Sequence, residues 1–470
     1  MPTAKDLRDR ALAAAGPAPP DYRETVIGTG SLGDTKAVTY RSGDDVRRTF
    51  DRGGYHTESG TYHGERWRQD ANGLTLVVAD DPGNAVKDPI TTTVARVTQP
   101  LDAYVISELN ARGAGMRTYY DPTTFRAVRE ERVNATGTVV TTYDEFGQFG
   151  TRTLPVRWTV SSKSSSIEMH YQRTESVANA ATNDDVQEAP TRRSLVEFPT
   201  GVTGVDLPLR IVNNVIYVRV NIGQHGADFV LDTGASGIAI DSQYAKSIGL
   251  TLTDATTEVV AGRFTSYDVL VPEMLIGPLR MHDIAINGIS MEAFGSAGVK
   301  PVGLLGFDFL AQLGVTLDYV HGKVHVVPAA AFTPPAGPPA YEFDVRLGNG
   351  VPMVTVSVAG AVAERVMFDT GWSGQVAFFD YFTRRYPGAF RNYLGQVGGH
   401  GVGGEFLGDF YRFHDVTLGP VRFEDVIGMR IAPSSSYLYA ADGVIGNQLL
   451  ALFTISLDYT GGRIYLTPTK

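Results

Sequence analysis

The chain has 470 residues, a formal net charge of −10, 43% hydrophobic residues and no cysteine. A single hydrophobic core rarely serves more than about 250 to 300 residues, so we expect two or three domains. The acidic balance disfavours nucleic acid or an anionic membrane as the main partner, and the lack of cysteine excludes disulfides, thiol nucleophiles and cysteine metal sites.

The start of the chain predicts a short helix. Residues 3–15 read TAKDLRDRALAAA, with charged residues between Ala and Leu, and Gly16 follows as a stop signal. We expect this helix to be peripheral and to form an N-terminal tail over residues 1–20.

Residues 21–193 predict a β domain. Runs such as GLTLVVAD, LPVRWTV and SSIEMHYQ alternate with turns rich in Gly, Asn and Asp. This pattern favours a curved antiparallel sheet or half-barrel. Similar runs continue along the whole chain, which predicts a mainly β protein.

No apolar stretch reaches the ~18 residues of a membrane-spanning helix, so no transmembrane segment is expected.

Two stretches predict the domain boundaries. Residues 178–193, ANAATNDDVQEAPTRR, lack large apolar side chains, which is typical of a linker. Residues 327–341, VPAAAFTPPAGPPAY, form a proline-rich spacer. We therefore expect further domains at 194–330 and 331–470.

The chain from residue 194 onward contains one pattern twice. GADFVLDTGASGIAID matches AERVMFDTGWSGQVAFFD, and VGLLGFDFLAQLGVTLDY matches DGVIGNQLLALFTISLDY. The two DTG aspartates, Asp232 and Asp369, lie 137 residues apart in the sequence. A pattern present twice predicts two pseudo-symmetric lobes that share a site at their junction.

Each copy places DTG directly after an apolar strand, FVL or VMF. We expect Gly234 and Gly371 to adopt a backbone conformation that other residues disfavour, which would hold each aspartate at a rigid strand end. Asp also caps turns through backbone N–H groups, but the recurrence of DTGxSG at matching positions disfavours that simpler role.

With these motifs the chain resembles the bacterial retropepsin-like and pepsin-like aspartic peptidases over roughly residues 200–470. Each lobe in that family carries a DTG loop and a later apolar-apolar-Gly segment. The resemblance implies two retropepsin-like β-barrel lobes that form a pepsin-like bilobal domain. It assigns Asp232 and Asp369 as the catalytic pair.

The resemblance also assigns supporting residues. The hydroxyls of Thr233 and Thr370 would cross-link the two DTG loops. The remaining supporting positions of the two loops are Gly234, Ser236, Gly371 and Ser373. The apolar-apolar-Gly segments are Leu304, Leu305 and Gly306 in the first lobe and Val444, Ile445 and Gly446 in the second.

Two carboxylates suit peptide hydrolysis because one can deprotonate water while the other donates a proton to the scissile carbonyl oxygen. Carboxylates about 3 Å apart cannot both ionise, so the pair is expected to share one proton. This chemistry needs no cofactor and no metal. HExxH, GxSxG and GxxxxGK[ST] are all absent from the sequence, which removes the main support for zinc, serine and nucleotide-dependent enzymes.

The main departure from the family pattern is Trp372, where Ala, Ser or Thr is usual; its counterpart is Ala235. We assign both positions to substrate binding. Trp372 has two interpretations: it forms the wall of a substrate pocket, or it fills the cleft and prevents cleavage.

Peptidases of this kind cover an extended substrate with a flap. Two glycine-containing segments are candidates, VVAGRFTSY over residues 259–267 and GQVGGHGVGGEF over residues 395–406. Such hairpins occur in any β protein, so a purely structural role stays open.

The first β domain is similar, in YYDPTTFRAVREERV and LPVRW, to the curved sheets of bacterial lipoprotein-carrier (LolA/LolB-like) proteins. This resemblance implies a concave sheet that holds an apolar or lipid ligand or part of a polypeptide. A structural or inhibitory role beside the peptidase is the alternative.

The sequence thus predicts a monomeric aspartic endopeptidase that acts on extended polypeptide. The resemblance to bacterial enzymes implies a periplasmic or secreted protein, although no signal peptide opens this chain. The alternative is a peptide- or ligand-binding protein on the same scaffold that does not cleave, with Trp372 as an anchoring aromatic.

Overall fold

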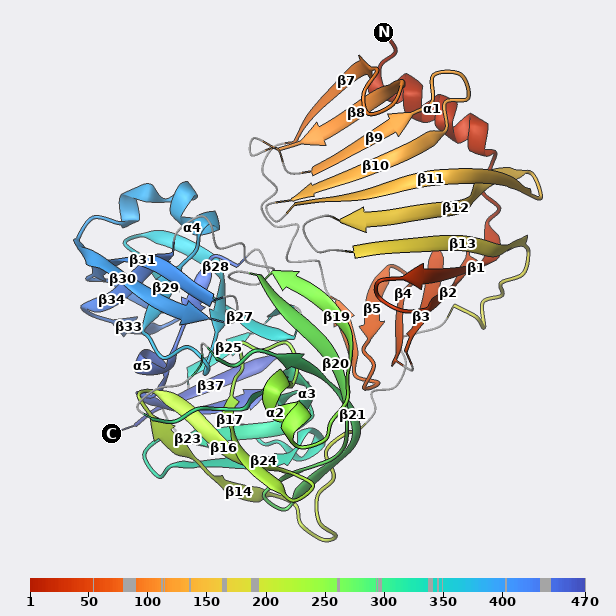
Figure 1. Ribbon diagram of the computed structural model, residues 1–470. Helices are drawn as coiled ribbons and strands as arrows, with labels where there is room; N and C mark the ends of the chain where they lie inside the picture. Colours follow the sequence, from red (N-terminus) through yellow and green to blue (C-terminus); the bar gives the residue numbers. More distant parts are fainter. Residues whose placement is uncertain are drawn as a thin grey trace. The chain divides into compact units, whose positions relative to one another are not determined.

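A computed structural model describes the chain except for residues 54, 79–89, 111–112, 114, 135–136, 163–166, 187–193, 260–262, 293, 295–297, 337–340, 345, 349, 402–403, 432–440 and 470. The chain divides into two compact units, Met1–Arg193 and Ser194–Lys470. Both consist mainly of β-strands, which confirms the prediction of a mainly β protein (Figure 1). No helix in the described residues is long and apolar enough to cross a membrane.

Helix α1 (Ala4–Ala15) opens the first unit, and its ends follow from the sequence. The side chain of Thr3 accepts a hydrogen bond from the Asp6 N–H, and the Asp6 carboxylate accepts one from the Thr3 N–H, so the two residues form a capping box. Gly16 ends the helix with φ of 79°, a conformation that favours glycine.

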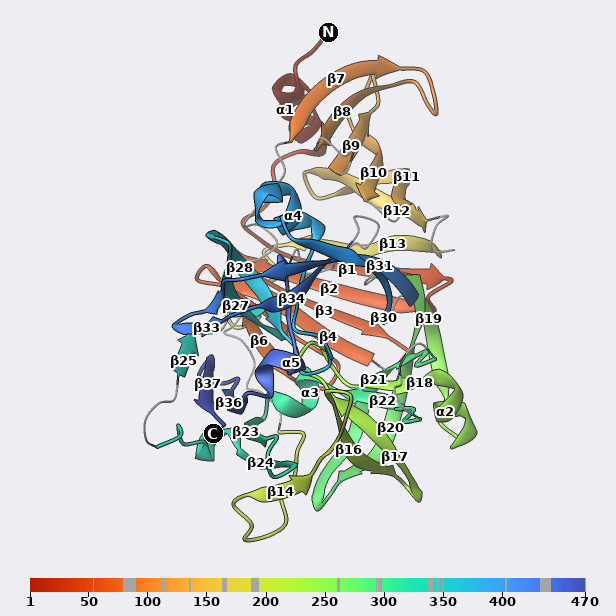
Figure 2. The same cartoon turned by 90° about the vertical axis from the view of Figure 1, so that its left-hand side faces the viewer.

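The rest of the first unit is a curved antiparallel sheet, as the sequence predicts (Figure 2). Among the described residues it has 13 strands in the order β6-β5-β4-β3-β2-β1-β13-β12-β11-β10-β9-β8-β7. The strands are β1 (Asp21–Gly30), β2 (Thr35–Ser42), β3 (Asp45–Arg52), β4 (Tyr55–Tyr62), β5 (Glu65–Gln69), β6 (Thr75–Val78), β7 (Thr91–Val97), β8 (Ala103–Leu109), β9 (Gly115–Tyr120), β10 (Ala127–Asn134), β11 (Gly137–Phe149), β12 (Arg152–Ser162) and β13 (Ile167–Ala178).

Helix α1 is not peripheral, contrary to our expectation. Leu7 is fully buried and packs with Ile106 and Tyr120 of the sheet. Every fourth or third position of the helix therefore faces the strands, and the helix covers the β7–β10 end of one sheet face. The physical reason is that the strands offer an apolar surface that Leu7, Ala4 and Ala11 can bury.

The described residues of the second unit form three sheets. A six-stranded sheet has the order β14-β24-β23-β36-β37-β25, and two larger sheets each belong to one half of the unit. The six strands are β14 (Val205–Pro208), β23 (Leu313–Asp318), β24 (Lys323–Pro328), β25 (Tyr341–Asp344), β36 (Phe453–Asp458) and β37 (Arg463–Pro468). It therefore draws strands from both halves.

The larger sheets contain the segments before and after each DTG. The strands of the first half are β15 (Arg210–Val212), β16 (Val215–Ile222), β17 (His225–Leu231), β18 (Ala239–Asp241), β19 (Leu252–Val259), β20 (Arg263–Ile276), β21 (Leu279–Ile289) and β22 (Gly303–Leu305). Those of the second half are β26 (Arg346–Gly348), β27 (Val351–Val358), β28 (Ala361–Phe368), β29 (Val376–Phe378), β30 (Tyr393–Gly401), β31 (Gly404–Phe413), β32 (Val416–Leu418), β33 (Val421–Phe423), β34 (Val426–Ile431) and β35 (Gly443–Ile445). Short helices join them: α2 (Ser242–Ser247), η2 (Ala329–Ala331), α3 (Phe307–Leu310), α4 (Asp380–Arg385), η3 (Pro387–Ala389) and α5 (Asn447–Leu450).

The two halves meet in the six-stranded sheet. Strands β23 and β36 pair antiparallel, with Thr316 directly opposite Ser456 and their hydroxyl oxygens 3.1 Å apart. Equivalent strands of the two copies therefore lie side by side, and both halves form one compact unit. The proline-rich spacer leaves this sheet through η2; its residues 337–340 lie outside the described residues, as do 187–193 of the expected linker.

Candidate active site

Both DTG aspartates lie at the ends of buried strands. Strand β17 pairs parallel with β22, and β28 pairs parallel with β35. The N–H of Asp232 donates to the carbonyl of Leu305, and the N–H of Asp369 donates to the carbonyl of Ile445, each at 3.0 Å. The apolar-apolar-Gly segments therefore hold the backbone at the start of each DTG loop.

The two threonines join the loops across the halves, as the resemblance implies. The N–H of Thr233 donates to Thr370 Oγ1 at 3.1 Å, and the N–H of Thr370 donates to Thr233 Oγ1 at 3.0 Å. Each hydroxyl then donates to a carbonyl of the opposite half, Thr233 to Phe368 at 2.5 Å and Thr370 to Leu231 at 2.7 Å. These four buried hydrogen bonds fix the separation of the two loops.

The glycines of the motif are needed for a reason that we did not predict. Neither Gly234 nor Gly371 has a positive φ, so a special backbone conformation is not the cause. A Cβ on Gly234 would lie 2.5 Å from Asp369 Cγ, and one on Gly371 would lie 2.5 Å from Asp232 Cγ. Each glycine therefore makes room for the carboxylate of the opposite half.

The carboxylates face one another in a largely buried site. The exposed fraction of Asp232 is only 9%. Its Oδ1 accepts the N–H of Gly234 at 2.8 Å. Asp369 Oδ1 accepts two, from Gly371 at 2.7 Å and Trp372 at 3.2 Å. The extra donor stabilises negative charge on Asp369 more than on Asp232.

The electrostatics of the pair are unequal. Burial, followed by the charge of Asp369, raises the pKa of Asp232 well above its ordinary value. Burial also raises the pKa of Asp369, but the hydrogen bond from Asp232 and the N–H groups of Gly371 and Trp372 oppose this effect. The additional N–H donor to Asp369 therefore favours ionisation of Asp369 before that of Asp232.

Trp372 packs back onto its own half. A Cβ on Gly446 would lie 2.3 Å from Trp372 Cδ1, and one on Gly374 would lie 2.6 Å from Trp372 Nε1. The indole also contacts the buried cluster that contains Met367 and Met429. Ala235 contacts the corresponding cluster of the first half. This placement favours a pocket wall over a plug.

The apolar-apolar-Gly segments also require glycine at their ends. A Cβ on Gly306 would lie 2.5 Å from the carbonyl oxygen of Ala235, and one on Gly446 would lie 2.4 Å from that of Trp372. By contrast, Ser236 and Ser373 are exposed and make no hydrogen bond within the described residues. The structure therefore does not bring their hydroxyls to the aspartates.

Asn447 is a site residue that our sequence reasoning missed. Its Nδ2 donates to the carbonyl of Thr370 and, at 2.7 Å, to the carbonyl of Asn214, and its Oδ1 accepts the hydroxyl of Tyr319 at 2.7 Å. It thus braces the second DTG loop against the first half. Its position after the repeated Gly could have drawn attention, because the first copy carries Phe307 there.

The equivalent place in the first half is aromatic. The ring of Phe307 lies edge-on to Tyr459, with centroids 6.0 Å apart. The buried hydroxyl of Tyr459 has no hydrogen-bond partner in the described part of the chain. Burial and the charges of Asp232 and Asp369 raise the pKa of Tyr459, so it stays a neutral phenol beside the pair.

Both candidate flaps lie in hairpins. Of the first, Val259 ends β19 and residues 263–267 begin its antiparallel partner β20; of the second, residues 395–401 belong to β30 and residues 404–406 to its partner β31 (Figure 1). Residues 260–262 and 402–403 lie outside the described residues. The flap assignment stays a prediction.

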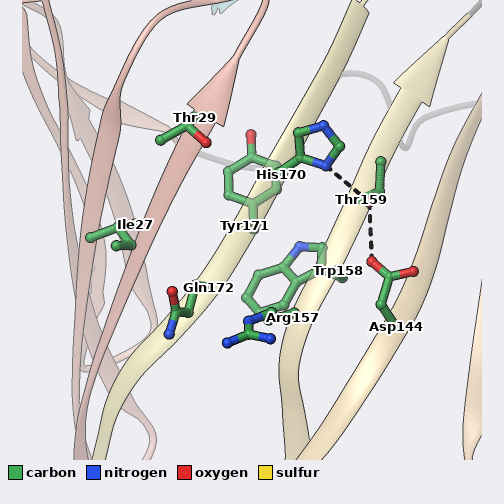
Figure 3. Close-up of a pocket in the computed structure, with 9 residues that line it drawn as sticks. All are labelled: Ile27, Thr29, Asp144, Arg157, Trp158, Thr159, His170, Tyr171 and Gln172. Carbon is green, nitrogen blue, oxygen red and sulfur yellow. Dashed lines mark hydrogen bonds between the residues drawn. The ribbon is translucent and has the colours of Figure 1, made fainter.

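A second group of polar side chains lies in the sheet unit. Thr159 Oγ1 is 3.1 Å from Asp144 Oδ2 and 3.2 Å from His170 Nδ1, beside a pocket of about 220 Å³ (Figure 3). All three groups are solvent-accessible, and the histidine contacts the hydroxyl and not the carboxylate. A base activates a hydroxyl nucleophile when a third group, such as a carboxylate, orients the base. His170 contacts Thr159 but not Asp144, so this arrangement does not activate the Thr159 hydroxyl. Among the described residues no group of three or more His, Asp or Glu could hold a metal ion.

Comparison with known proteins supports an aspartyl protease region. The sequence profile of the aspartyl protease family matches residues 216–309, which include Asp232. No curated protein matches the chain.

Two solved structures are similar in shape to part of the chain. A DUF1329 family protein from Desulfovibrio piger has 11% identity and a TM-score of 0.29, and the match covers 38% of this chain and 93% of that one. A LolA superfamily protein from Nitrosomonas europaea has 7% identity and a TM-score of 0.31, covering 40% and 99%.

Proposed function

We propose that residues 194–470 form an aspartic endopeptidase with two retropepsin-like lobes, 194–330 and 331–470, that hydrolyses extended polypeptide. The observation that carries this proposal is the fit between the halves: each DTG glycine lies against the carboxylate of the other half. Cross-linked threonines keep the two carboxylates in that position. A monomer suffices, because one chain supplies both aspartates.

The unequal environments of the two carboxylates support different roles for Asp232 and Asp369. Asp369, which ionises first, accepts a proton from a bound water as the water oxygen attacks the scissile carbonyl carbon. Asp232 donates its proton to the carbonyl oxygen, which gives a neutral tetrahedral diol. As the diol collapses, one of its hydroxyl protons returns to Asp232, and Asp369 passes the proton that it took from water to the amide nitrogen. The peptide C–N bond then breaks, and the pair regains its starting state.

Asn substitution of either aspartate tests the proposal. Asp232→Asn and Asp369→Asn should each lower cleavage of a denatured protein by at least about a thousandfold, and the double variant should lose little more, because the two groups act as a unit. Asp425→Asn is a matched control, because Asp425 is an exposed aspartate with φ of 54°, which Asn tolerates.

A non-cleaving binding protein on the same scaffold is the alternative outcome. It predicts that wild type and Asp369→Asn bind an extended peptide with equal affinity and that mass spectrometry finds no product with either. Intact and truncated chains should both be tested from pH 3 to 8, because residues 1–193 can act as a cover.

A further inference from the structure

Four arginines lie on one face of the sheet unit. In β2–β5, Arg41 is opposite Val46, Val46 is opposite Thr61, and Thr61 is opposite Arg66. The next row on the same face places Arg48 opposite Ser59, and Ser59 opposite Arg68. Opposed residues of antiparallel strands share a face, so Arg41, Arg48, Arg66 and Arg68 form one arginine cluster.

Three of the four arginines have no counter-ion in the described part of the chain. Arg41, Arg48 and Arg66 make no hydrogen bond or ion pair there, and the Nε of Arg41 is buried without a partner. On the opposite face, by contrast, Arg47 binds Glu58 at 2.8 Å. Adjacent like charges repel, so the cluster is electrostatically suited to an added anion.

The nearest carboxylate in these rows is already engaged. Glu24 stands at the end of the second row, opposite Thr39 of β2. It lies 3.7 Å from Arg173 and 3.9 Å from Arg152, and it accepts the hydroxyl of Ser176 at 3.2 Å. Glu24 therefore neutralises a different pair of arginines.

The cluster lines a real hollow. A pocket of about 450 Å³ is bordered by three of the arginines and by two hydroxyl groups. The lining residues are Val46, Arg48, Ser59, Gly60, Thr61, Arg66, Trp67 and Arg68. Guanidinium groups bind phosphate and carboxylate through two parallel hydrogen bonds, and hydroxyls add further donors.

An apolar row lies directly beside the cluster. Two residues further along the strands, Val26 is opposite Ala37 and Ala37 is opposite Phe50. Rows of this kind are about 7 Å apart, since a strand rises about 3.4 Å per residue. Beyond this row, the same face carries the stacked rings of Trp158 and Tyr171. A charged end and an apolar row thus adjoin on one face of the sheet.

We propose that the arginine cluster binds the phosphate headgroup of an anionic amphiphile, whose alkyl chain lies along Val26, Ala37 and Phe50. This site is independent of the aspartate pair. The whole chain has a net charge of −10, so the positive charge of the arginine cluster, and not the net charge of the chain, selects the anionic ligand.

Isothermal titration of the full chain with four probes tests the proposal at fixed ionic strength. Dodecyl phosphate, below its micelle concentration, should bind with about 1:1 stoichiometry. Inorganic phosphate and dodecyl maltoside should each bind at least about tenfold more weakly, because each lacks one half of the recognised chemistry. Hexaglutamate should not displace bound dodecyl phosphate.

Matched variants locate the site. Arg48→Ala with Arg66→Ala should weaken dodecyl phosphate binding at least about tenfold, because two charge-assisted contacts are lost. Lys36→Ala with Arg157→Ala removes two cations from the opposite face and should leave the affinity unchanged. Arg48→Lys should keep only part of the wild-type affinity for dodecyl phosphate, since an ammonium cannot form the two parallel hydrogen bonds of a guanidinium. Asp232→Asn should bind as wild type does.

Four results would overturn the proposal. These are no binding of dodecyl phosphate, equal affinity for dodecyl maltoside or for inorganic phosphate, an equal loss in the control pair, or tighter binding of hexaglutamate, which would point to an acidic peptide. Circular dichroism of each variant separates loss of the site from loss of the fold.

Discussion

Gly371 lies directly against the carboxylate of Asp232, close enough that a methyl group on Gly371 would be 2.5 Å from the carboxyl carbon. The same relation holds between Gly234 and Asp369. The motif therefore uses glycine to let two carboxylates approach, and this reciprocal fit has direct consequences for substitution.

We expect Gly371→Ala and Gly234→Ala each to destabilise the protein by about 1–3 kcal/mol through overpacking. Because the pair would be pushed apart, cleavage should also fall by at least about a hundredfold. Urea unfolding and peptide cleavage assays measure the two effects. Gly388→Ala is the control, since a Cβ there meets no atom closer than 3.9 Å; similar losses in all three variants would refute the argument.

The pH profile should reflect the raised pKa values of the pair. Activity requires one proton on the two carboxylates, so it falls on the acid side as Asp369 is protonated and on the alkaline side as Asp232 loses its proton. Since the pKa of Asp232 lies well above its ordinary value, the alkaline limb should lie well above the normal aspartate range. Measuring kcat/KM from pH 3 to 8 checks this, and a decline complete by about pH 4 would contradict it.

Asp232→Asn should stabilise the fold at neutral pH by about 0.5–2 kcal/mol, as is common when a strained functional group is removed. The folded state holds the Asp232 proton more tightly than the unfolded state, so wild-type stability falls as pH rises from the ordinary aspartate pKa through the raised one. The advantage of the variant should therefore be small near pH 3 and grow toward pH 7. Urea unfolding at both values measures it; a pH-independent difference would count against the raised pKa.

Asn447 is expected to be a positioning residue. Asn447→Ala leaves the buried hydroxyl of Tyr319 without its acceptor and frees the carbonyl of Thr370, at a cost of about 1–3 kcal/mol. Tyr319→Phe should cost less. A double-mutant cycle between the two should show coupling, and additive effects would mean that the hydrogen bond contributes nothing.

Trp372→Ala distinguishes the two interpretations of the indole. If Trp372 forms a pocket wall, the variant should cleave a peptide library with altered side-chain preference and lower kcat/KM for its best substrates. If the indole fills the cleft, the variant should instead gain activity. Its packing on Gly374 and Gly446 supports the first outcome.

Several features could be predicted from the sequence because they depend on neighbours along the chain. The cap at Thr3, the stop at Gly16 and the strands that precede DTG follow from local preferences and strand pattern. The repeated pattern, interpreted as two lobes, also predicted equivalent positions for Asp232 and Asp369.

Other features depend on contacts between residues far apart in the sequence. The role of Gly234 and Gly371 was predicted incorrectly, since the cause is the carboxylate of the opposite half and not the local φ. Asn447 and the arginine cluster were not predicted at all, because strand register decides which side chains share a face.

The sequence by itself therefore determined the mainly β class, the leading helix and the two DTG motifs, all of which are carried by local pattern. Only the tertiary structure decided that Asp369 receives one more N–H donor than Asp232, that Trp372 packs on its own half and that four arginines meet beside an apolar row. The reason is that burial, charge proximity and cross-strand register arise only when distant segments are brought together.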